Sequence, residues 1–219
     1  PTERFARLAH DRLLDIAIRE FGLKGLEGAS TRSIAAAAGT AMSAITYHFG
    51  GKEGLYLAAA DHIAAQLGED MSRAFDMTAA IDYRDPAAAR AAIHMILGSF
   101  ADKLMHKDSE SRSLFIVREQ MHPTEAFDRI YGGMMGRMLE TLVRLVCVAS
   151  GDRDEARARL LTVTLIGQVI VLRASTASCL RLLRRDAVDA ALVEDLKARV
   201  AANVDAILDS INSTPQEPQ

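Results

Sequence analysis

The sequence predicts an all-α protein, and three observations lead to that prediction. Aromatic residues make up only 5% of the 219 residues and tryptophan is absent, whereas strands favour aromatic and β-branched side chains. Alanine and leucine, which favour helices, recur throughout the chain. Apolar residues repeat at helical spacing, as Leu13, Ala17 and Phe21 do, and no stretch alternates with the period of a strand.

The charge balance differs between the two ends of the chain. The whole sequence carries a formal net charge of −3. Residues 1–52 hold seven Lys or Arg against five Asp or Glu, a balance of about +2, which leaves about −5 for residues 53–219. A slightly basic end on an acidic body has the sign expected of a DNA-binding region joined to another domain.

The sequence lacks the common signals of enzymes, metal sites and membrane proteins. Cys147 and Cys179 lie in apolar helical runs without a cysteine or histidine at metal-binding spacing, so we expect both to be small buried residues. No nucleophile elbow, phosphate loop or dinucleotide fingerprint occurs. The most apolar run, 160–172, is shorter than the ~20 residues that cross a bilayer, and no secretory signal is visible. We therefore expect a soluble, cytoplasmic, non-enzymatic protein without a cofactor or metal.

Two short helices joined by a tight turn are predicted near the N-terminus. A preceding helix should cover Thr2–Gly22, with a connection over Leu23–Ala29. Ser30 suits the N-cap of the first short helix, and Gly39 suits its end, where the chain reverses with positive φ. The second short helix runs from about Met42 to His48. Such a pair is a helix-turn-helix, whose second helix enters the major groove of DNA.

A longer pattern is formed by Ile34-Ala35, Ala38-Gly39, Ile45, Tyr47-His48-Phe49, Lys52-Glu53 and Leu55. This pattern resembles the DNA-binding signature of TetR-type transcriptional regulators, and the match covers residues 1 to about 60. The sequence departs from the usual signature at Thr40, Met42 and Thr46. These departures bear on base preference and phosphate contact rather than on the fold.

The resemblance implies two kinds of DNA contact. The residues that should project into the major groove are Met42, Ser43, Ala44 and Thr46. The residues at positions where the family grips phosphate are Ser30, Arg32, Tyr47, His48 and Lys52. Hydroxyl groups and a lysine suit phosphate oxygens, and a threonine can contact a base edge or a thymine methyl group. In the alternative interpretation, Tyr47 and His48 merely pack the second helix.

Further helices follow the helix-turn-helix. They are predicted over Lys52 to about Phe75, Pro86–His106, Ser113–Met121, Thr124–Ser150, Arg153 to about Leu183, and Ala187–Ile211. Residues 107–112 should be turn-like, and the helix that starts at Arg153 should bend near Ser175-Thr176. The predicted organisation is a helix-turn-helix DNA-binding domain over 1–53, a helical effector-binding and dimerisation domain over 54–212, and a flexible tail over 213–219.

A narrower resemblance lies in the second half of the chain. Its residues are Arg118-Glu119, Pro123-Thr124 and Phe127, and later Gly167-Gln168 and Arg173. They resemble the effector domain of the CecR-type branch of the same family, which implies a small-molecule effector. We expect a mostly apolar effector in a pocket lined by Phe100, Leu104, Phe115, Arg118, Glu119, His122, Phe127, Met134 and Met138. Arg118 and Glu119 fit a plain surface network equally well.

Three glycines interrupt one predicted long helix. Gly132, Gly133 and Gly136 each lower its propensity by up to ~1 kcal/mol relative to alanine. They either leave room for a ligand or let another helix approach closely, and close packing is the commoner reason.

The two last predicted helices carry more apolar surface than one core-facing stripe needs, which predicts a homodimer. The expected interface consists of Leu160, Val163, Ile166, Gln168, Ile170, Leu196, Val200, Val204 and Ile207. Gln168 lies among apolar residues and needs a partner if buried. That partner can lie across the dimer, at Thr164, on a neighbouring helix or on a ligand.

Together these features predict a ligand-responsive transcriptional regulator, a repressor that a small molecule releases from a palindromic operator in double-stranded DNA. The alternative is a helical ligand-binding or scaffold protein that does not bind DNA specifically. The slight positive charge of residues 1–52 keeps that alternative open, and salt-dependent retention on heparin or on a nonspecific duplex distinguishes the two.

Overall fold

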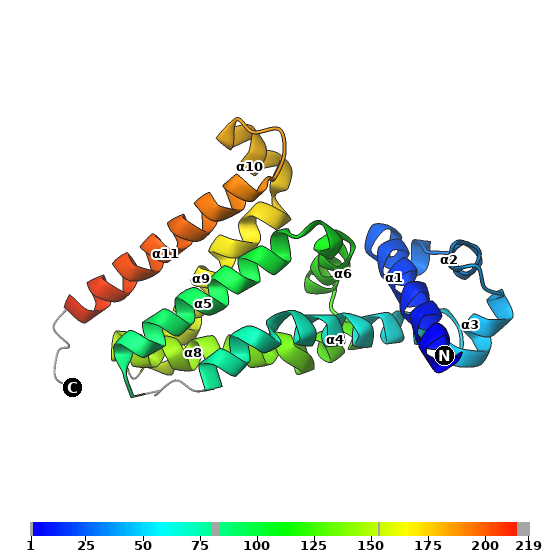
Figure 1. Cartoon of the computed structure of the whole chain (residues 1–219), viewed down its shortest axis with the longest axis horizontal. Coiled ribbons are helices and arrows are strands. Elements are labelled where there is room, and N and C mark those ends of the chain that lie inside the picture. The colour runs from blue at the N-terminus through cyan, green and yellow to red at the C-terminus, as the bar shows by residue number, and fades with distance from the viewer. Residues whose placement is uncertain (1, 80–83, 153, 214–219) are drawn as a thin grey trace. The chain divides into compact units, whose positions relative to one another are not determined.

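The computed structural model describes residues 2–79, 84–152 and 154–213, and these residues form helices and short connections (Figure 1). The first helices are α1 (Thr2–Gly28), α2 (Thr31–Ala38), α3 (Met42–Phe49) and α4 (Lys52–Ala79). They are followed by α5 (Pro86–Met105), a 3-10 turn η1 (Lys107–Ser109), α6 (Glu110–Met121), α7 (Glu125–Ile130) and a π-helical turn η2 (Tyr131–Met135). The last are α8 (Gly136–Ser150), α9 (Glu155–Ala174), α10 (Thr176–Leu183) and α11 (Ala190–Ser213). The described residues contain no strand, so the predicted all-α class is confirmed.

The chain divides into two compact units. The head unit comprises Pro1–Glu69 and Lys107–Gly136, and the body unit comprises Asp70–His106 and Arg137–Gln219. Helices α6 and α7 therefore belong with the N-terminal helices, and α4 contributes to both units. The predicted boundary at residues 53 and 54 falls in the first turn of α4. The predicted tail lies, apart from the last residue of α11, outside the described residues.

Glycines change the ends of two predicted helices. Helix α1 does not stop at Gly22 but continues to Gly28 through a break at Gly25, where φ is 73° and ψ is 175°. The predicted connection over 23–29 was wrong because a glycine can take this positive φ while the turns beside it stay helical. The predicted helix over 124–150 is likewise divided by Gly133, whose ψ of −138° is not helical.

Two other predictions about the helices have clear outcomes. Residues 107–112 are not all turn-like, since α6 already starts at Glu110. The predicted bend near Ser175-Thr176 is confirmed, because α9 and α10 meet there at 87°.

The predicted burial of the two cysteines was wrong, because Cys147 and Cys179 are both partly exposed. Among the described residues, no single helix is long and apolar enough to cross a bilayer, and only the bent pair of α9 and α10 meets that test jointly.

Three aromatic rings from three helices form the centre of the head unit. The ring of Tyr56 on α4 lies edge-on to Phe21 of α1 at 4.9 Å and stacks on Phe115 of α6 at 4.6 Å. All three side chains are buried. Such pairs add about 0.5–1.5 kcal/mol beyond the apolar area that they bury. The rings therefore join α6 to the N-terminal helices.

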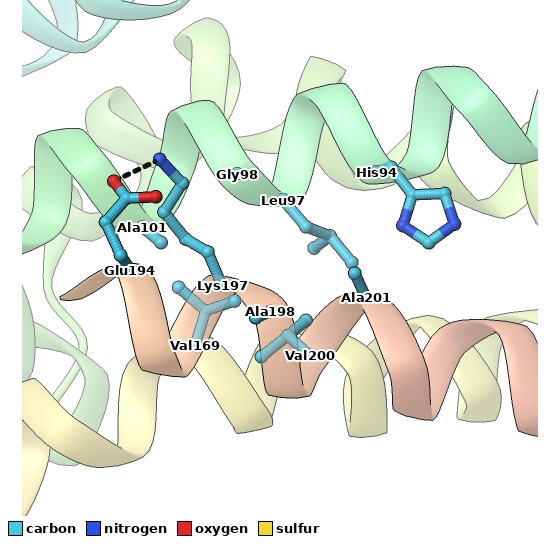
Figure 2. Close-up of a pocket in the computed structure, with 10 residues that line it drawn as sticks. All are labelled: His94, Leu97, Gly98, Ala101, Val169, Glu194, Lys197, Ala198, Val200 and Ala201. Carbon is cyan, nitrogen blue, oxygen red and sulfur yellow. Dashed lines mark hydrogen bonds and ion pairs between the residues drawn. The ribbon is translucent and has the colours of Figure 1, made fainter. Parts of the chain in front are cut away.

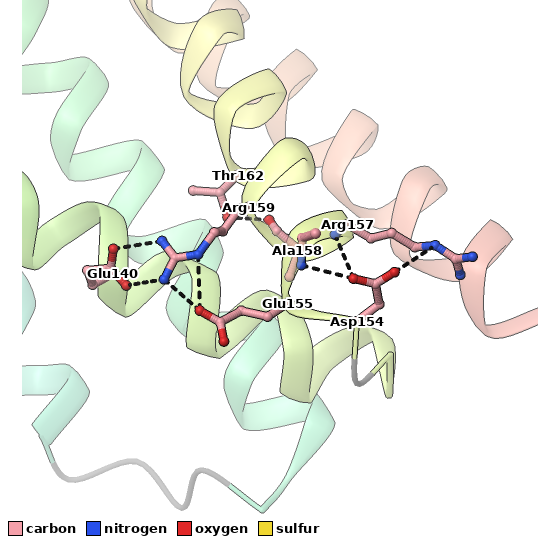
Figure 3. Close-up of polar contacts among 8 residues, drawn as sticks. Glu140, Asp154, Glu155, Arg157, Ala158, Arg159 and Thr162 are labelled. Carbon is pink, nitrogen blue, oxygen red and sulfur yellow. Dashed lines mark hydrogen bonds and ion pairs between the residues drawn. The ribbon is translucent and has the colours of Figure 1, made fainter.

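Polar side chains join the helices of the body unit. Arg159 on α9 donates to both carboxylate oxygens of Glu140 on α8, at 2.8 and 3.0 Å, and to Glu155 (Figure 3). Arg173 donates to the carbonyl oxygens of Leu104 and His106, at 2.6 and 3.2 Å, and so caps the C-terminal end of α5.

Gln168 has a partner within its own chain. Its Oε1 accepts a hydrogen bond of 2.6 Å from the side-chain amide of Asn203 on α11. Of the partners that the sequence left open, the structure therefore shows a neighbouring helix.

Candidate DNA-binding surface and ligand region

Capping residues define helix α2. The Ser30 side chain accepts a hydrogen bond from the N–H group of Ser33 at 3.4 Å, in the N-cap arrangement. At the other end Gly39 has φ of 70°, and the N–H groups of Gly39 and Thr40 donate to the carbonyls of Ala36 and Ala35. This pair of bonds is the Schellman ending, which turns the chain toward α3.

Helix α3 is anchored on one side and open on the other. Ile45 is buried, and it packs α3 into the core of the head unit. The side chains left exposed are Met42, Ser43, Thr46, Tyr47 and His48, with Ala44 half-buried. Tyr47 is 85% exposed, so the alternative in which it packs α3 does not hold for its ring. Helix α3 carries no acidic residue, so its open face presents hydroxyl, thioether and aromatic groups without a charge that would repel phosphate.

Lys52 lies where α3, α4 and the end of α1 meet. Its Nζ donates to the carbonyl oxygen of Glu27 at 3.1 Å, and this bond caps the end of α1. The residue therefore has an internal role besides the phosphate contact that the sequence predicts. The turn before it is tight: Gly50 and Gly51 have φ of 75° and 125°, and a Cβ at Gly54 would lie 1.7 Å from the carbonyl oxygen of Phe49.

Arg118 belongs to the predicted pocket, yet it contacts the backbone of α1. Its guanidinium donates to the carbonyl oxygens of Gly22 and Leu23, at 3.4 and 3.2 Å. A Cβ at Gly25 would lie 3.0 Å from the same guanidinium, so the missing side chain of Gly25 leaves space for the Arg118 guanidinium. Arg118 thus ties α6 to the backbone of α1 just before the break at Gly25.

Glu119 is 2% exposed, and its carboxylate is fully used inside the head unit. One oxygen accepts from the Tyr56 hydroxyl at 2.6 Å. The other accepts from the N–H and hydroxyl of Thr124 and from the N–H of Phe127, at 2.9–3.0 Å, and so caps the start of α7. Burial, followed by the hydrogen bond to Glu119, raises the pKa of Tyr56. A negative charge at a helix N-terminus is favourable, and these bonds offset the cost of burying it.

Close packing explains two of the three glycines singled out from the sequence. A Cβ at Gly133 would lie 3.2 Å from the Cβ of Ala64 on α4. A Cβ at Gly136 would lie 2.5 Å from the carbonyl oxygen of Tyr131, inside the π-helical turn. Gly132 has open space around it. The first two glycines therefore favour close approach over a ligand cavity.

Comparison with known proteins gives matches to both parts of the chain. Residues 13–59 match the family described as "Bacterial regulatory proteins, tetR family". Residues 89–211 match "HTH-type transcriptional dual regulator CecR, C-terminal domain". A protein of that name from Shigella flexneri is 33% identical over 209 residues, which cover 93% of each chain. The chain belongs to the TetR family of transcriptional regulators.

Other relatives agree with this TetR-family membership. The HTH-type transcriptional regulatory protein RaaS of Mycobacterium tuberculosis is 30% identical over 159 residues, which cover 71% of this chain and 67% of RaaS. The crystal structure of a TetR-like transcriptional regulator from Rhodococcus sp. RHA1 superimposes with a TM-score of 0.60. It covers 90% of this chain and 96% of its own at 17% identity, and so shows the shared fold.

TetR-family regulators usually form dimers, and the predicted interface residues of this chain divide into two groups. Val204, Val200 and Ile166 are 0%, 4% and 7% exposed, so their side chains lie in the core of the chain and present no surface to a partner. Gln168, Ile170, Leu196 and Ile207 are half-buried. Leu160 and Val163 are 67% and 66% exposed. The sequence pattern could not separate these groups because both are apolar and both recur at helical spacing.

The predicted pocket residues of this TetR-family chain also divide between the compact units. Phe100, Leu104 and Met138 lie in the body unit, and the other six lie in the head unit. Phe115 is buried in the aromatic cluster, and His122 is exposed.

None of the nine predicted pocket residues lines the hollow of about 330 Å³ that the body unit contains. That hollow is lined by His94, Leu97, Gly98, Ala101, Val169, Glu194, Lys197, Ala198, Val200 and Ala201. Small residues at helical spacing on α5 and α11, such as Gly98, Ala101, Ala198 and Ala201, are the signal that the sequence analysis missed. The described residues hold no cluster of His, Cys, Asp and Glu that could bind a metal ion.

Proposed function

We propose that the protein is a ligand-responsive repressor that binds a two-fold symmetric operator as a homodimer and is released from it by a small molecule. It acts on DNA in the cytoplasm. The observation that carries the proposal is the open face of α3, where Ser43, Thr46 and Tyr47 are exposed while Ile45 anchors the helix beneath them. A second helix held in this way after a glycine turn is the element that reads the major groove.

The groove contacts and the phosphate contacts come from different parts of this surface. Met42, Ser43, Ala44 and Thr46 face the bases. Ser30, Arg32, Tyr47, His48 and Lys52 contact phosphates at the flanks, where they position the head without reading sequence. Met42 offers only apolar contact, so base preference depends on Ser43, Thr46 and the shape of the DNA.

The dimer forms through the exposed face of α9. Leu160, Val163, Gly167 and Val171 are all exposed and follow one another at intervals of three and four residues, which places them on one side of the helix. Ala202 and Ala206 on α11 are exposed as well, and small side chains let a partner helix approach closely. An apolar stripe of this kind supports self-association, and a two-fold dimer presents two heads to two half-sites.

The decisive experiment is the selection of bound sequences from random duplexes. We expect an inverted repeat whose half-sites lie about one helical turn apart, ~34–36 Å, or a multiple of it. Thr46→Ala should change the selected sequence. If the protein retains duplexes in a salt-dependent way but enriches no sequence, the alternative of a helical protein without specific DNA binding is favoured. Transcription from a template that carries the selected site tests the sign of regulation, and repression predicts a lower yield when the protein is added.

Charge at the α9 stripe tests the assembly. Val163→Asp should give a folded monomer that loses operator affinity, as sedimentation and operator titration would show. Val200→Asp is the matched comparison, because it places a charge in the core and should unfold the protein instead. A wild-type protein that sediments as a monomer at micromolar concentration contradicts the dimer.

A further inference from the structure

The hollow of the body unit has a mostly apolar lining made by three helices. Leu97, Gly98 and Ala101 come from α5, Val169 from α9 and Val200 from α11, with Ala198 and Ala201 beside it (Figure 2). Its volume of about 330 Å³ lies at the small end of the range of ligand sites in proteins. The hollow therefore suits a molecule of modest size with an apolar body.

One lysine lies at the edge of this hollow and is held by two carboxylates. The Nζ of Lys197 donates to both oxygens of Asp102 on α5, at 2.9 and 3.1 Å, and to Glu194 on α11 at 2.9 Å (Figure 2 draws the bond to Glu194). The hydrogen bonds to Glu194 and Asp102 raise the pKa of Lys197. The two carboxylates thus share one ammonium group.

The other edge of the hollow is also rich in carboxylates. His94 on α5 contacts Asp205 of α11 at 2.9 Å between Nε2 and Oδ1. Arg90 on α5 pairs with Asp205 and Asp209. The third wall, α9, contributes only the apolar Val169 to the lining. Along both edges four carboxylates face two permanent cations, so negative charge is in excess even when His94 is counted as a third cation.

We propose that this hollow binds a small organic cation, whose apolar body fills the space between α5, α9 and α11 and whose ammonium group takes a position at Glu194 and Asp102. An anion is disfavoured because Lys197 already has two carboxylate partners, so an added anion would be the third negative group around one ammonium. A cation either displaces the flexible Lys197 side chain toward solvent, taking over its carboxylate partners, or shares those partners with it.

This inference deepens the proposed function and depends on it only for the consequence of binding. The ion pair between Lys197 and Asp102 joins α11 to α5. A ligand that replaces this pair by its own contacts favours whichever spacing of the two helices fits it. It can then change operator affinity only as far as it binds the two arrangements differently.

Three probes that share a phenyl ring on a short alkyl chain and differ in their polar end group test the site: 4-phenylbutylamine, 4-phenylbutanol and 4-phenylbutyrate. Their dissociation constants are measured on the full-length protein from the chemical shifts of the Leu97, Val169 and Val200 methyl groups. We expect the amine to bind at least tenfold more tightly than the acid, with the alcohol between them. Equal affinities, tighter binding of the acid, or no shift of these methyl groups at millimolar amine overturns the proposal.

Two neighbouring residues on α11 give a matched pair of variants. Glu194→Gln removes a carboxylate that lines the hollow, and it should reduce the preference for the amine to about threefold or less. Asp195→Asn makes the same change of charge at a side chain that is similarly exposed, 71% against 68% for Glu194, but does not line the hollow. It should therefore leave the preference unchanged. Lys197→Met removes the competing ammonium and should strengthen amine binding. An equal effect of Glu194→Gln and Asp195→Asn would mean that only the net charge matters, and would overturn the assigned site.

Operator titration separates this site from the proposed function. Saturating amine should change the operator affinity of the wild type by at least threefold, and that of Glu194→Gln by much less at the same concentration. If the amine binds but operator affinity does not change, the binding site is supported and its regulatory role is contradicted. Failure of the protein to bind any operator contradicts the proposed function, while the methyl titration still decides the site.

Discussion

The open face of α3 and the last turns of α6 both carry polar residues of a family motif, yet those residues differ in what they contact. On α3, Ser43, Thr46 and Tyr47 are exposed. On α6, Arg118 donates to carbonyl groups of α1, and Glu119 is buried with four hydrogen bonds. The first set is available to a partner molecule, and the second is already used within the fold.

This difference shows that a polar motif can serve recognition or internal support. A buried carboxylate without partners costs free energy, so a motif that enters the core must bring its donors with it. Glu119 has them in Tyr56, Thr124 and Phe127. Substitutions of Arg118 and Glu119 should therefore lower the free energy of unfolding, whereas those of the exposed residues of α3 should lower operator affinity alone. The following substitutions test this distinction, in order of their expected effect on unfolding.

The largest effect is expected at the turn that leads from α3 into α4. Gly54→Ala would place a Cβ 1.7 Å from the carbonyl oxygen of Phe49, so the backbone must move. We expect a loss of about 3 kcal/mol in the free energy of unfolding, the upper end of the usual cost of overpacking, together with loss of operator binding. Gly68→Ala, on the same helix with open space around it, should raise stability by up to ~1 kcal/mol. Urea denaturation of both variants measures the contrast, and equal stabilities would show that the turn adapts freely.

Removal of the buried carboxylate should have the next largest effect. Glu119→Ala leaves the Tyr56 hydroxyl and the start of α7 without an acceptor, at an expected cost of about 2–3 kcal/mol. Tyr56→Phe alone should cost about 1 kcal/mol, and the double variant should cost less than the sum of the two. Gln120→Ala, at the exposed neighbouring position, should stay within about 0.5 kcal/mol of the wild type. Additive effects in the double variant would contradict a direct Tyr56–Glu119 bond.

Lys52 combines an internal role with a partner-facing one, so its removal should affect both measurements. Lys52→Ala loses the bond to the Glu27 carbonyl, at a cost of about 0.5–1.5 kcal/mol. If it also contacts phosphate, the slope of log affinity against log salt should fall by about 0.9. Lys24→Ala is the control of equal charge, because Lys24 pairs with Glu20 on α1. A changed stability with an unchanged salt slope would restrict Lys52 to the internal role.

The smallest effect on unfolding is expected at the most exposed motif residue. Tyr47→Ala removes a ring that is 85% exposed, so the free energy of unfolding should change by less than about 0.5 kcal/mol. Operator affinity should nevertheless fall by up to about tenfold, the value of one hydrogen bond to phosphate. Denaturation and operator titration on the same preparation compare the two. A large loss of stability would group Tyr47 with Arg118 and Glu119 instead.

Local features of the sequence determined most of the helices and the helix-turn-helix. The caps at Ser30 and Gly39 and the bend near Ser175 involve groups a few residues apart, so the amino acids nearby suffice to predict them. The helix-turn-helix signature is equally compact. Within α1, by contrast, the sequence predicts a connection over Leu23–Ala29, although the helix continues to Gly28. A local pattern shows that the chain can turn, but it does not show whether distant contacts such as Arg118 hold the next turn in place.

Only the tertiary structure decided which apolar and polar residues face a partner. Val163 and Val200 have the same chemistry and similar helical neighbours, yet one is exposed and the other buried. Glu119 meets Tyr56 across 63 positions of sequence, and Gln168 meets Asn203 across 35. The hollow at Lys197 exists because small residues of α5 and α11 lie opposite each other. Periodicity specifies the face of a helix, but what covers that face depends on how distant segments pack, which the residues of one helix do not encode.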